Sequence, residues 1–264
     1  MRIIAELEGR SRRIYTGAIG HIAPGRRARF SVAIRTALID REKKIAEYGV
    51  GAGITWDSDS GAEYRECLQK ARILEQRMPD FSLLESLRWE PQKAYWLIEE
   101  HLARLAGSAE YFAFPWDRQK VLAKLAALAA GLRACPHKVR LLLSADGGLH
   151  AEAAPIAPNP ERPLRLRLAA APVVADDPFL YHKTTHRTPY EKARCGVGEC
   201  DEVLLWNERG EVTEAATANL VVELDGTRIT PPVVSGLLPG TLRARLLAEG
   251  KIVDGVVTRE ALRR

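Results

Sequence analysis

The sequence has few cysteines, few aromatic residues and no long uninterrupted apolar run. Cysteines number 4 among 264 residues, and their spacing matches neither a common zinc motif nor a disulfide-rich scaffold. No apolar run approaches the roughly 18 residues that a membrane span needs, and the first residues lack the apolar core of a signal peptide. These absences predict a protein of the reducing cytoplasm that makes no contact with a membrane.

Charge of one sign is also not concentrated anywhere along the chain. The net charge is +5, but 39 basic residues alternate with 34 acidic ones and form no tract of the kind that binds nucleic acid. The basic balance favours anionic small molecules as partners, or has no specific meaning. Hydrophobic residues make up 46% of the sequence, which is enough for one large or two modest folded domains.

The character of the sequence changes near residues 75–82, and this predicts a domain at 1–78 and another at 79–264. The first block has three strand-like runs, "IYTGAIGHI", "RFSVAIRTALI" and "IAEYGVGAGITW". We expect an antiparallel meander followed by one helix. Apolar residues recur on that helix at spacings of three and four and predict a stripe covered by a sheet: Tyr64, Cys67, Leu68, Ala71 and Leu74.

The second block has an α+β pattern. A strand "LLESLRW" precedes two helical segments, "AYWLIEEHLARLAGSAEYF" and "RQKVLAKLAALAAGLRA". Strands are predicted at "KVRLLLS", "LHAEAAPI" and "LRLRLAAAPVV", and a hairpin is predicted to turn at 208–210. A helix is expected from Pro239 to Glu249, with Pro239 in its first turn, and "TREALRR" begins another helix.

Glycines alternate in the first block at Gly49, Gly51 and Gly53. This spacing is not that of a dinucleotide-binding loop. Glycine at alternate strand positions permits close approach of a ligand to the backbone, and a β-bulge is the structural alternative.

Two carboxylates follow the glycines on the first turn of the predicted helix. Glu63 and Glu66 are three residues apart, so both can face one hard cation. The alternative is a capping box formed by Ser60 and Glu63, since acidic residues are common in a first helical turn.

Arg35 lies within an apolar run of the first block, and Tyr15 lies in another. An arginine in the middle of an apolar strand run must be exposed at a sheet edge, paired, or directed at an anion, because an unpaired buried charge is too costly. A carboxylate ligand and an internal salt bridge are equally open interpretations of Arg35.

Lys183 is surrounded by cationic residues in the stretch "YHKTTHRTPYEKAR". Desolvation or the nearby charges of His182, His186 and Arg187 would lower its pKa and make its amine a nucleophile. A solvated surface lysine is the ordinary alternative.

Two further features strengthen the catalytic interpretation. Glu214 follows the hairpin turn, and "SGLLPGTLRARLL" begins a helix whose N–H groups can bind an anion. A lysine, a carboxylate for a ring nitrogen and a helix start for a phosphate are together the groups that pyridoxal phosphate requires.

Three stretches of the second block resemble the class IV aminotransferases, the fold-type IV family of pyridoxal phosphate enzymes. "YHKTTHRTPYEKA", "DEVLLWNERGEVTEAATANL" and "GLLPGTLRARLL" are most similar to its 4-amino-4-deoxychorismate lyase branch. In the first block "YTGAIG", "VAIRTA" and "GAGITWDSDSGAEYREC" resemble the C-terminal end of the chorismate-utilising enzymes. The resemblance implies part of an α/β sandwich of aminodeoxychorismate synthase component I, fused to a domain like D-amino-acid aminotransferase.

For the second block, the resemblance implies the following roles. Lys183 would bind the cofactor covalently and shuttle protons, and Glu214 would keep the pyridine nitrogen protonated. The remaining cofactor-binding residues would be Arg104 on the phosphate, Thr241 and Leu242 at the helix start, and Tyr190 beside the lysine. Such enzymes eliminate pyruvate from 4-amino-4-deoxychorismate to give para-aminobenzoate for folate, and two chains build the site.

For the first block, the resemblance implies a chorismate site and a magnesium site. Tyr15 and Arg35 would bind a chorismate carboxylate, with the backbone at Gly51 and Gly53 lining that site. Magnesium would be held by Glu63 and Glu66. Ammonia would come from a separate glutamine amidotransferase subunit.

Other interpretations stay open. A branched-chain or D-amino-acid aminotransferase would share Lys183 and Glu214, although the fused first block argues against it. The family continues before residue 1 and after residue 264, so the chain is expected to be incomplete at both ends. An inactive fragment or a scaffold for a partner is therefore a further alternative.

Overall fold

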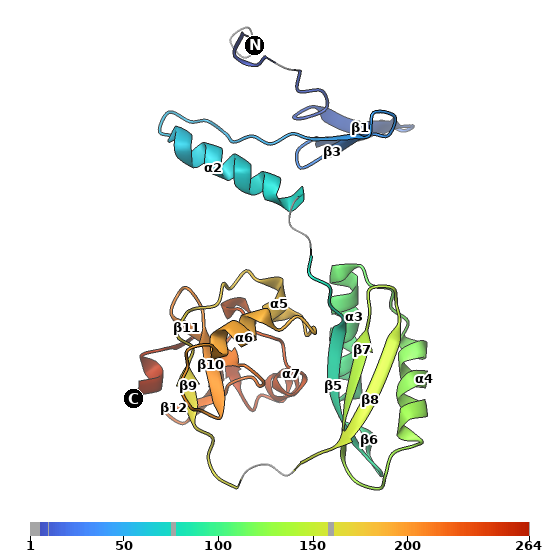
Figure 1. The fold of residues 1–264 in the computed structure, drawn as a ribbon, viewed down its shortest axis with the longest axis vertical. Helices are drawn as coiled ribbons and strands as arrows, with labels where there is room; N and C mark the ends of the chain where they lie inside the picture. Colours follow the sequence, from blue (N-terminus) through green and yellow to red (C-terminus); the bar gives the residue numbers. More distant parts are fainter. Residues whose placement is uncertain (1–5, 10, 75–77, 158–160, 264) are drawn as a thin grey trace. The chain divides into compact units, whose positions relative to one another are not determined.

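The computed structural model describes residues 6–9, 11–74, 78–157 and 161–263. The chain divides into two compact units, Met1–Met78 and Pro79–Arg264, and Figure 1 labels many of their helices and strands. No helix in these described ranges has the length and apolar character that a bilayer span requires.

Within its described residues, the first unit contains short strands and the α-helix Ser60–Ala71. Of the third predicted strand run, residues 45–56, only the first four residues form a strand. The elements are β1 Ala18–Ala23, β2 Arg27–Val32, β3 Ala37–Asp40, β4 Ile45–Tyr48, α2 Ser60–Ala71 and the 3₁₀ helix η1 Arg72–Leu74.

The second predicted run, residues 29–39, forms two strands instead of one. Between β2 and β3, Arg35 has a φ of 50°, which an extended strand cannot accommodate. The chain therefore bends, so that β2 pairs with β1 and β3 pairs with β4. The prediction of one continuous meander is wrong. Arg35 is an exposed residue of the connection and not a residue in the middle of a strand.

The start of α2 also differs from the sequence prediction. Asp59 is the N-cap, and its side chain accepts a hydrogen bond of 2.8 Å from the backbone N–H of Ala62. Ser60 is already the first helical residue, so the predicted capping box is wrong. The helix buries none of its side chains, and Tyr64 is 65% exposed. The predicted apolar stripe is not covered within this unit.

The second unit begins with an antiparallel sheet of strand order β6-β5-β7-β8. The strands predicted at both ends of this block are present, and the first helix begins four residues later than predicted. The elements are β5 Leu83–Glu90, β6 Ala94–Tyr95, α3 Ile98–Phe112, α4 Arg118–Ala129, β7 His137–Leu143 and β8 Leu149–Pro155.

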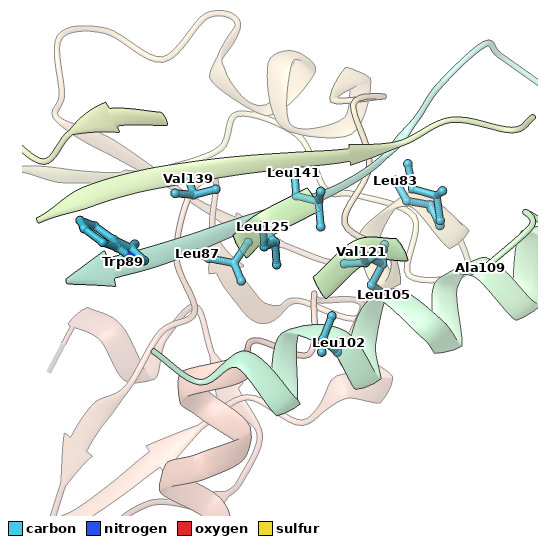
Figure 2. Close-up of a cluster of buried hydrophobic side chains, with 11 residues drawn as sticks. Leu83, Leu87, Trp89, Leu102, Leu105, Ala109, Val121, Leu125, Val139 and Leu141 are labelled. Atoms are coloured by element: carbon cyan, nitrogen blue, oxygen red, sulfur yellow. The ribbon is translucent and has the colours of Figure 1, made fainter. Parts of the chain in front are cut away.

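A core forms where this sheet packs against α3 and α4. Alternate side chains of β5 are buried, as the period of two requires. Asp117 caps α4 by accepting hydrogen bonds from the N–H groups of Gln119 and Lys120. Figure 2 shows strand and helix side chains meeting between the layers: Leu83, Leu87, Trp89, Leu102, Leu105, Ala109, Val121, Leu125, Val139 and Leu141.

The remainder of the second unit contains two smaller sheets, of order β15-β11-β10-β9 and β12-β13-β14. The predicted hairpin is present as β10 and β11. The elements are β9 Leu166–Leu168, α5 Pro178–Tyr181, α6 Thr188–Arg194, β10 Glu202–Trp206, β11 Glu211–Ala215, β12 Val222–Leu224, β13 Thr227–Thr230, η2 Val233–Ser235, α7 Thr241–Ala248, β14 Val253–Asp254, β15 Val257–Thr258 and η3 Ala261–Arg263.

The last two helices differ from their predicted form. α7 begins at Thr241 with Gly240 as its N-cap, so Pro239 precedes the helix and does not lie in its first turn. The terminal segment forms the single 3₁₀ turn η3 instead of the start of an α-helix.

Candidate active site

A cavity of about 350 Å³ lies in the second unit, within the size range of small-molecule sites. It is formed by residues of β5, α3, the segment around residue 183, the end of β11 with its following loop, and the start of α7. All six residues predicted to bind the cofactor line it: Arg104, Lys183, Tyr190, Glu214, Thr241 and Leu242. The fold therefore brings together groups that are far apart in the sequence.

Lys183 is positioned by pairing of its backbone with the start of β5. Its carbonyl oxygen accepts a hydrogen bond of 2.9 Å from the N–H of Leu84, and Thr184 forms a β-bridge with Leu83. Thr185 extends this pairing, because its N–H donates to the carbonyl oxygen of Ser82 and its hydroxyl oxygen accepts from the N–H of Ser82. The short helices α5 and α6 flank the segment, and the pairing with β5 holds the Lys183 backbone at the cavity wall.

The electrostatic surroundings of Lys183 favour a neutral amine. Burial lowers the pKa of Lys183 to about 8, and the positive charges of Arg104 and Arg187 act in the same direction. Near neutral pH about one amine in ten is then uncharged, against about one in several thousand for an ordinary lysine. The site therefore favours the neutral form of the Lys183 amine, which is the form that can attack an electrophile or accept a proton.

Glu214, on β11, is 3% exposed and accepts three hydrogen bonds. Its Oε1 accepts from the Tyr190 hydroxyl at 2.9 Å and from the N–H of Leu238 at 3.1 Å, and its Oε2 accepts from Asn219 Nδ2 at 3.1 Å. Burial nevertheless raises the pKa of Glu214 to about 7. This carboxyl can hold a proton at neutral pH and can share it with a basic nitrogen.

Arg104, on α3, is held by a buried carboxylate. Its Nε donates to Glu85 Oε1 at 2.9 Å and its Nη2 donates to Oε2 at 2.6 Å. His101 Nδ1 lies 2.7 Å from Glu85 Oε2. Although burial alone would raise the pKa of Glu85, the hydrogen bonds from His101 and Arg104 hold it below its usual value.

The cluster of Glu85, His101 and Arg104 connects the sheet β6-β5-β7-β8 with the start of α7. Arg104 Nη1 donates to the carbonyl oxygen of Pro239 at 3.2 Å, and Thr241 Oγ1 lies 3.5 Å from His101 Nε2. The first N–H groups of a helix have no acceptor within the helix, so those at the start of α7 are available to an anion in the cavity. Arg104 adds its positive charge at the same end.

Glu85→Ala is expected to lower the free energy of unfolding by about 3–5 kcal/mol, because it leaves the charge of Arg104 buried without its partner. Urea unfolding would measure the change. Glu90→Ala is the matched control on the same strand, since Glu90 pairs with the half-exposed Arg88, and its effect should be much smaller than that of Glu85→Ala. Equal losses in the two variants would contradict this account of Glu85.

The groups that line the cavity fit pyridoxal phosphate. Lys183 supplies an amine for its aldehyde, and Glu214 supplies a buried carboxyl for its ring nitrogen. The start of α7 and Arg104 supply N–H groups and positive charge for its phosphate. One cavity thus provides a partner for the aldehyde, for the ring nitrogen and for the phosphate of this cofactor.

In the first unit the structure brings Tyr15 against the glycine-rich segment. A Cβ atom on Gly49 would lie 2.4 Å from the Tyr15 ring, and one on Gly51 would lie 2.7 Å from its hydroxyl. Close approach is thus required here by a side chain of the same unit. Tyr15 and Gly49 also line a cavity of about 560 Å³ with Arg12 and Arg13.

The other residues predicted for the first unit lie outside that cavity. Arg35 and Gly53 are exposed, and a Cβ on Gly53 would meet nothing within 4 Å. Glu63 accepts a hydrogen bond of 2.7 Å from Ser58, and Glu66 pairs with Lys70 at 2.6 Å. Within the described part of the chain, no three histidine, cysteine or acidic residues cluster in a way that could hold a metal ion.

Sequence reasoning did not identify Glu85, His101 or Asn219. A signal for Glu85 was present, because it occupies an inward position of the alternating strand "LLESLRW". A carboxylate at a core position must be paired, and His101 and Arg104 lie one helical turn apart on the helix that covers it. No such signal marks Asn219, which lies in the loop after β11 and donates a hydrogen bond to Glu214.

Comparison with known families matches both units. Residues 82–264 match the model of the family described as amino-transferase class IV, and residues 1–76 match that of the chorismate binding enzymes. The predicted resemblance and fold class are confirmed by these matches. The first unit matches only part of its relatives: a segment of 83 residues is 39% identical to anthranilate synthase component 1 of Cereibacter sphaeroides, and covers 16% of that protein.

Individual relatives of the second unit include two differently named proteins. The "Putative aminodeoxychorismate lyase" of Schizosaccharomyces pombe is 29% identical over 180 residues, which cover 66% of this chain and 77% of that protein. The crystal structure of a "Putative amino-acid aminotransferase" from Mesorhizobium loti has 37% identity and a TM-score of 0.65. It covers 70% of this chain and 90% of that one.

Proposed function

The chain belongs to the class IV aminotransferase family, and we propose that its second unit is a pyridoxal-phosphate-dependent 4-amino-4-deoxychorismate lyase. The observation that carries the proposal is the convergence of Lys183, Glu214 and the start of α7 on one cavity. The similarity to the lyase-named protein of S. pombe and the fused chorismate-binding match favour this substrate. The products are pyruvate and para-aminobenzoate.

Lys183 acts first as a nucleophile and then as a base. The amine is neutral often enough near pH 7 to hold the cofactor through its aldehyde, because burial lowers its pKa to about 8. When bound, pyridoxal phosphate would withdraw electrons from the carbon that carries the substrate amine and so ease removal of the ring proton. Lys183 Nζ accepts that proton as the carbon–oxygen bond to the enolpyruvyl group breaks. The proton then passes to the departing enolpyruvate, which leaves as pyruvate.

Glu214 fixes the protonation of the site at the other end. Its carboxyl has a pKa of about 7 because of burial, and it would hold a proton shared with the ring nitrogen. Tyr190 and Leu238 orient its Oε1 through their hydrogen bonds. Thr241, Leu242 and Arg104 would hold the phosphate, with Glu85 and His101 keeping Arg104 in place.

For the first unit we propose a part of a chorismate-binding synthase domain. Its match to that family supports the proposal, together with a cavity that Tyr15 lines. The proposed chorismate contacts are Tyr15, Arg35, Gly51 and Gly53, and the proposed magnesium ligands are Glu63 and Glu66. We further propose ammonia supply by a glutamine amidotransferase subunit, and a homodimer formed through the second unit.

An amino-acid aminotransferase is the second candidate function. It is supported by the 37% identity to the Mesorhizobium loti protein, and it would use Lys183 and Glu214 in the same way. The two activities differ in what the substrate loses, since a lyase releases pyruvate and an aminotransferase transfers an amino group to a 2-oxo acid.

The test supplies the protein and pyridoxal phosphate with 4-amino-4-deoxychorismate, and follows pyruvate with lactate dehydrogenase and para-aminobenzoate by fluorescence. Equal amounts of both products support the lyase. Amino acids with 2-oxoglutarate, assayed in parallel, would support the aminotransferase if they alone react. If neither reaction occurs and the absorbance of pyridoxal phosphate is unchanged by the protein, the chain is a scaffold or an inactive fragment.

A further inference from the structure

Arg187 lies on the wall of the cavity, four residues after Lys183 and just before α6. Its Nη2 donates a hydrogen bond to the carbonyl oxygen of Ala216. Its guanidinium carbon lies 3.9 Å from the centre of the Tyr190 ring. These two contacts hold the guanidinium on the cavity wall, stacked on one face of the tyrosine.

The other arginines of the cavity are already paired with carboxylates. Arg104 binds Glu85 through two hydrogen bonds, and the buried Arg243 pairs with Asp254. Arg187 has no ion pair with any carboxylate in the described ranges. A guanidinium has five N–H donors, and Ala216 accepts from only one nitrogen. Positive charge and donors are therefore available at this point of the cavity.

Tyr190 is the other donor next to Lys183, but its hydroxyl is already engaged. It donates to Glu214 Oε1 at 2.9 Å, and the Arg187 guanidinium covers its ring. A tyrosine with this orientation helps to hold the Glu214 carboxyl in place. The donors of Arg187 therefore remain available in the cavity that Lys183 and Glu214 also line.

The chemistry of pyridoxal phosphate indicates which of its groups the donors of Arg187 would bind. The aldehyde and the ring nitrogen lie at opposite ends of the pyridine ring, and the phosphate arm and the phenolic oxygen lie on opposite edges between them. Lys183 marks the aldehyde, Glu214 marks the nitrogen, and Arg104 with the start of α7 marks the phosphate edge. The one edge without a partner is that of the phenolic oxygen.

We propose that Arg187 binds the phenolic oxygen of pyridoxal phosphate, an inference that rests on the proposed function. Burial lowers the pKa of Lys183, and the charges of Arg104 and Arg187 lower it further. Burial raises the pKa of Glu214, and the charge of Arg187 opposes that rise. Arg187 therefore acts on both groups, with which it lines one cavity. Arg187 would stabilise the negative charge of the phenolate through a charge-assisted hydrogen bond.

The test compares two ligands in three proteins, so that general damage to the site cancels. Dissociation constants of pyridoxal phosphate and of 3-deoxypyridoxal phosphate, which lacks only the phenolic oxygen, are measured for the wild type, Arg187→Lys and Arg187→Met. The preference of the wild type for pyridoxal phosphate should exceed that of Arg187→Met by about 10-fold to 100-fold, as expected for one charge-assisted hydrogen bond. Arg187→Lys should lie between them.

An equal preference in the wild type and Arg187→Met would overturn the inference, even if both ligands bind more weakly to the variant. Arg187→Lys keeps a charge on the wall and provides the same comparison if the methionine variant fails to fold, as judged by circular dichroism. If the wild type binds neither ligand, the proposed function itself fails. Normal binding with an unchanged preference removes only the role of Arg187.

Discussion

Replacement of Lys183 by alanine is expected to reduce pyruvate release from 4-amino-4-deoxychorismate by about 1,000-fold or more. The variant loses both the nucleophile that binds the cofactor and the base that accepts the ring proton, and a positioned base alone contributes about 100-fold to 10,000-fold. The absorbance change that the wild type produces with pyridoxal phosphate should also disappear. Both quantities are measured on the same protein samples.

Two control variants separate the amine of Lys183 from its charge. Lys192→Ala removes an exposed lysine of the neighbouring helix α6 and should leave both quantities unchanged. Lys183→Arg keeps a positive charge but is not deprotonated at neutral pH, so it should be as inactive as the alanine variant. Retained activity in either Lys183 variant would show that another group performs the chemistry.

The residues of this site could be predicted because their local sequence carries chemical information. The amine of Lys183 is flanked by cations, Glu214 follows a hairpin turn, and Thr241 begins a helix. Each feature is visible within about ten residues, and the structure places all three on one cavity. Their convergence depends on distant contacts, such as that of Leu84 with Lys183 and that of Arg104 with Pro239. Spacing along the chain does not reveal such contacts.

The buried partners of the site were harder to recognise. Glu85 was included in a strand by its period of two, and that period does not distinguish a paired carboxylate from a leucine. The sequence marks Arg187 only as a charge near Lys183, because its contacts with Ala216 and with the Tyr190 ring arise in the folded chain. Orientation of a side chain is a property of the folded environment and not of the pattern.

In the first unit, the sequence pattern predicted the positions of the strands better than their connection and packing. Its apolar runs predicted strands in about the right places, but the positive φ of Arg35 divides one run in two. β-propensity describes how side chains fit a pleated surface, and it contains no information about a single left-handed residue. The predicted stripe of α2 is also exposed in this unit, because an amphipathic pattern predicts a buried face without supplying the surface that buries it.

Glu214→Gln is expected to lower the activity and to remove a pH-dependent loss of stability. Lyase turnover should fall by about 100-fold or more, because the neutral amide cannot hold the shared proton. Without cofactor, the Glu214→Gln variant should lack a decline in stability that the wild type shows as the pH rises toward neutral. In the wild type the folded carboxyl has a pKa of about 7 against its usual 4.5, so folding binds a proton. Stability therefore falls as the pH rises from 4.5 to about 7, by about 3 kcal/mol in total.

The pH dependence isolates this effect from the hydrogen bonds that the substitution also changes, since those are lost equally at every pH. Urea unfolding of the cofactor-free proteins should show a decline over this range for the wild type that Glu214→Gln lacks. Glu211→Gln, on the same strand, is the matched control, because hydrogen bonding to Arg209 lowers the pKa of Glu211 to about 2. The stability that Glu211 contributes is complete above its usual pKa of 4.5, so this control should run parallel to the wild type. If Glu214→Gln also runs parallel, Glu214 is ionised throughout and the proton must be supplied by another group.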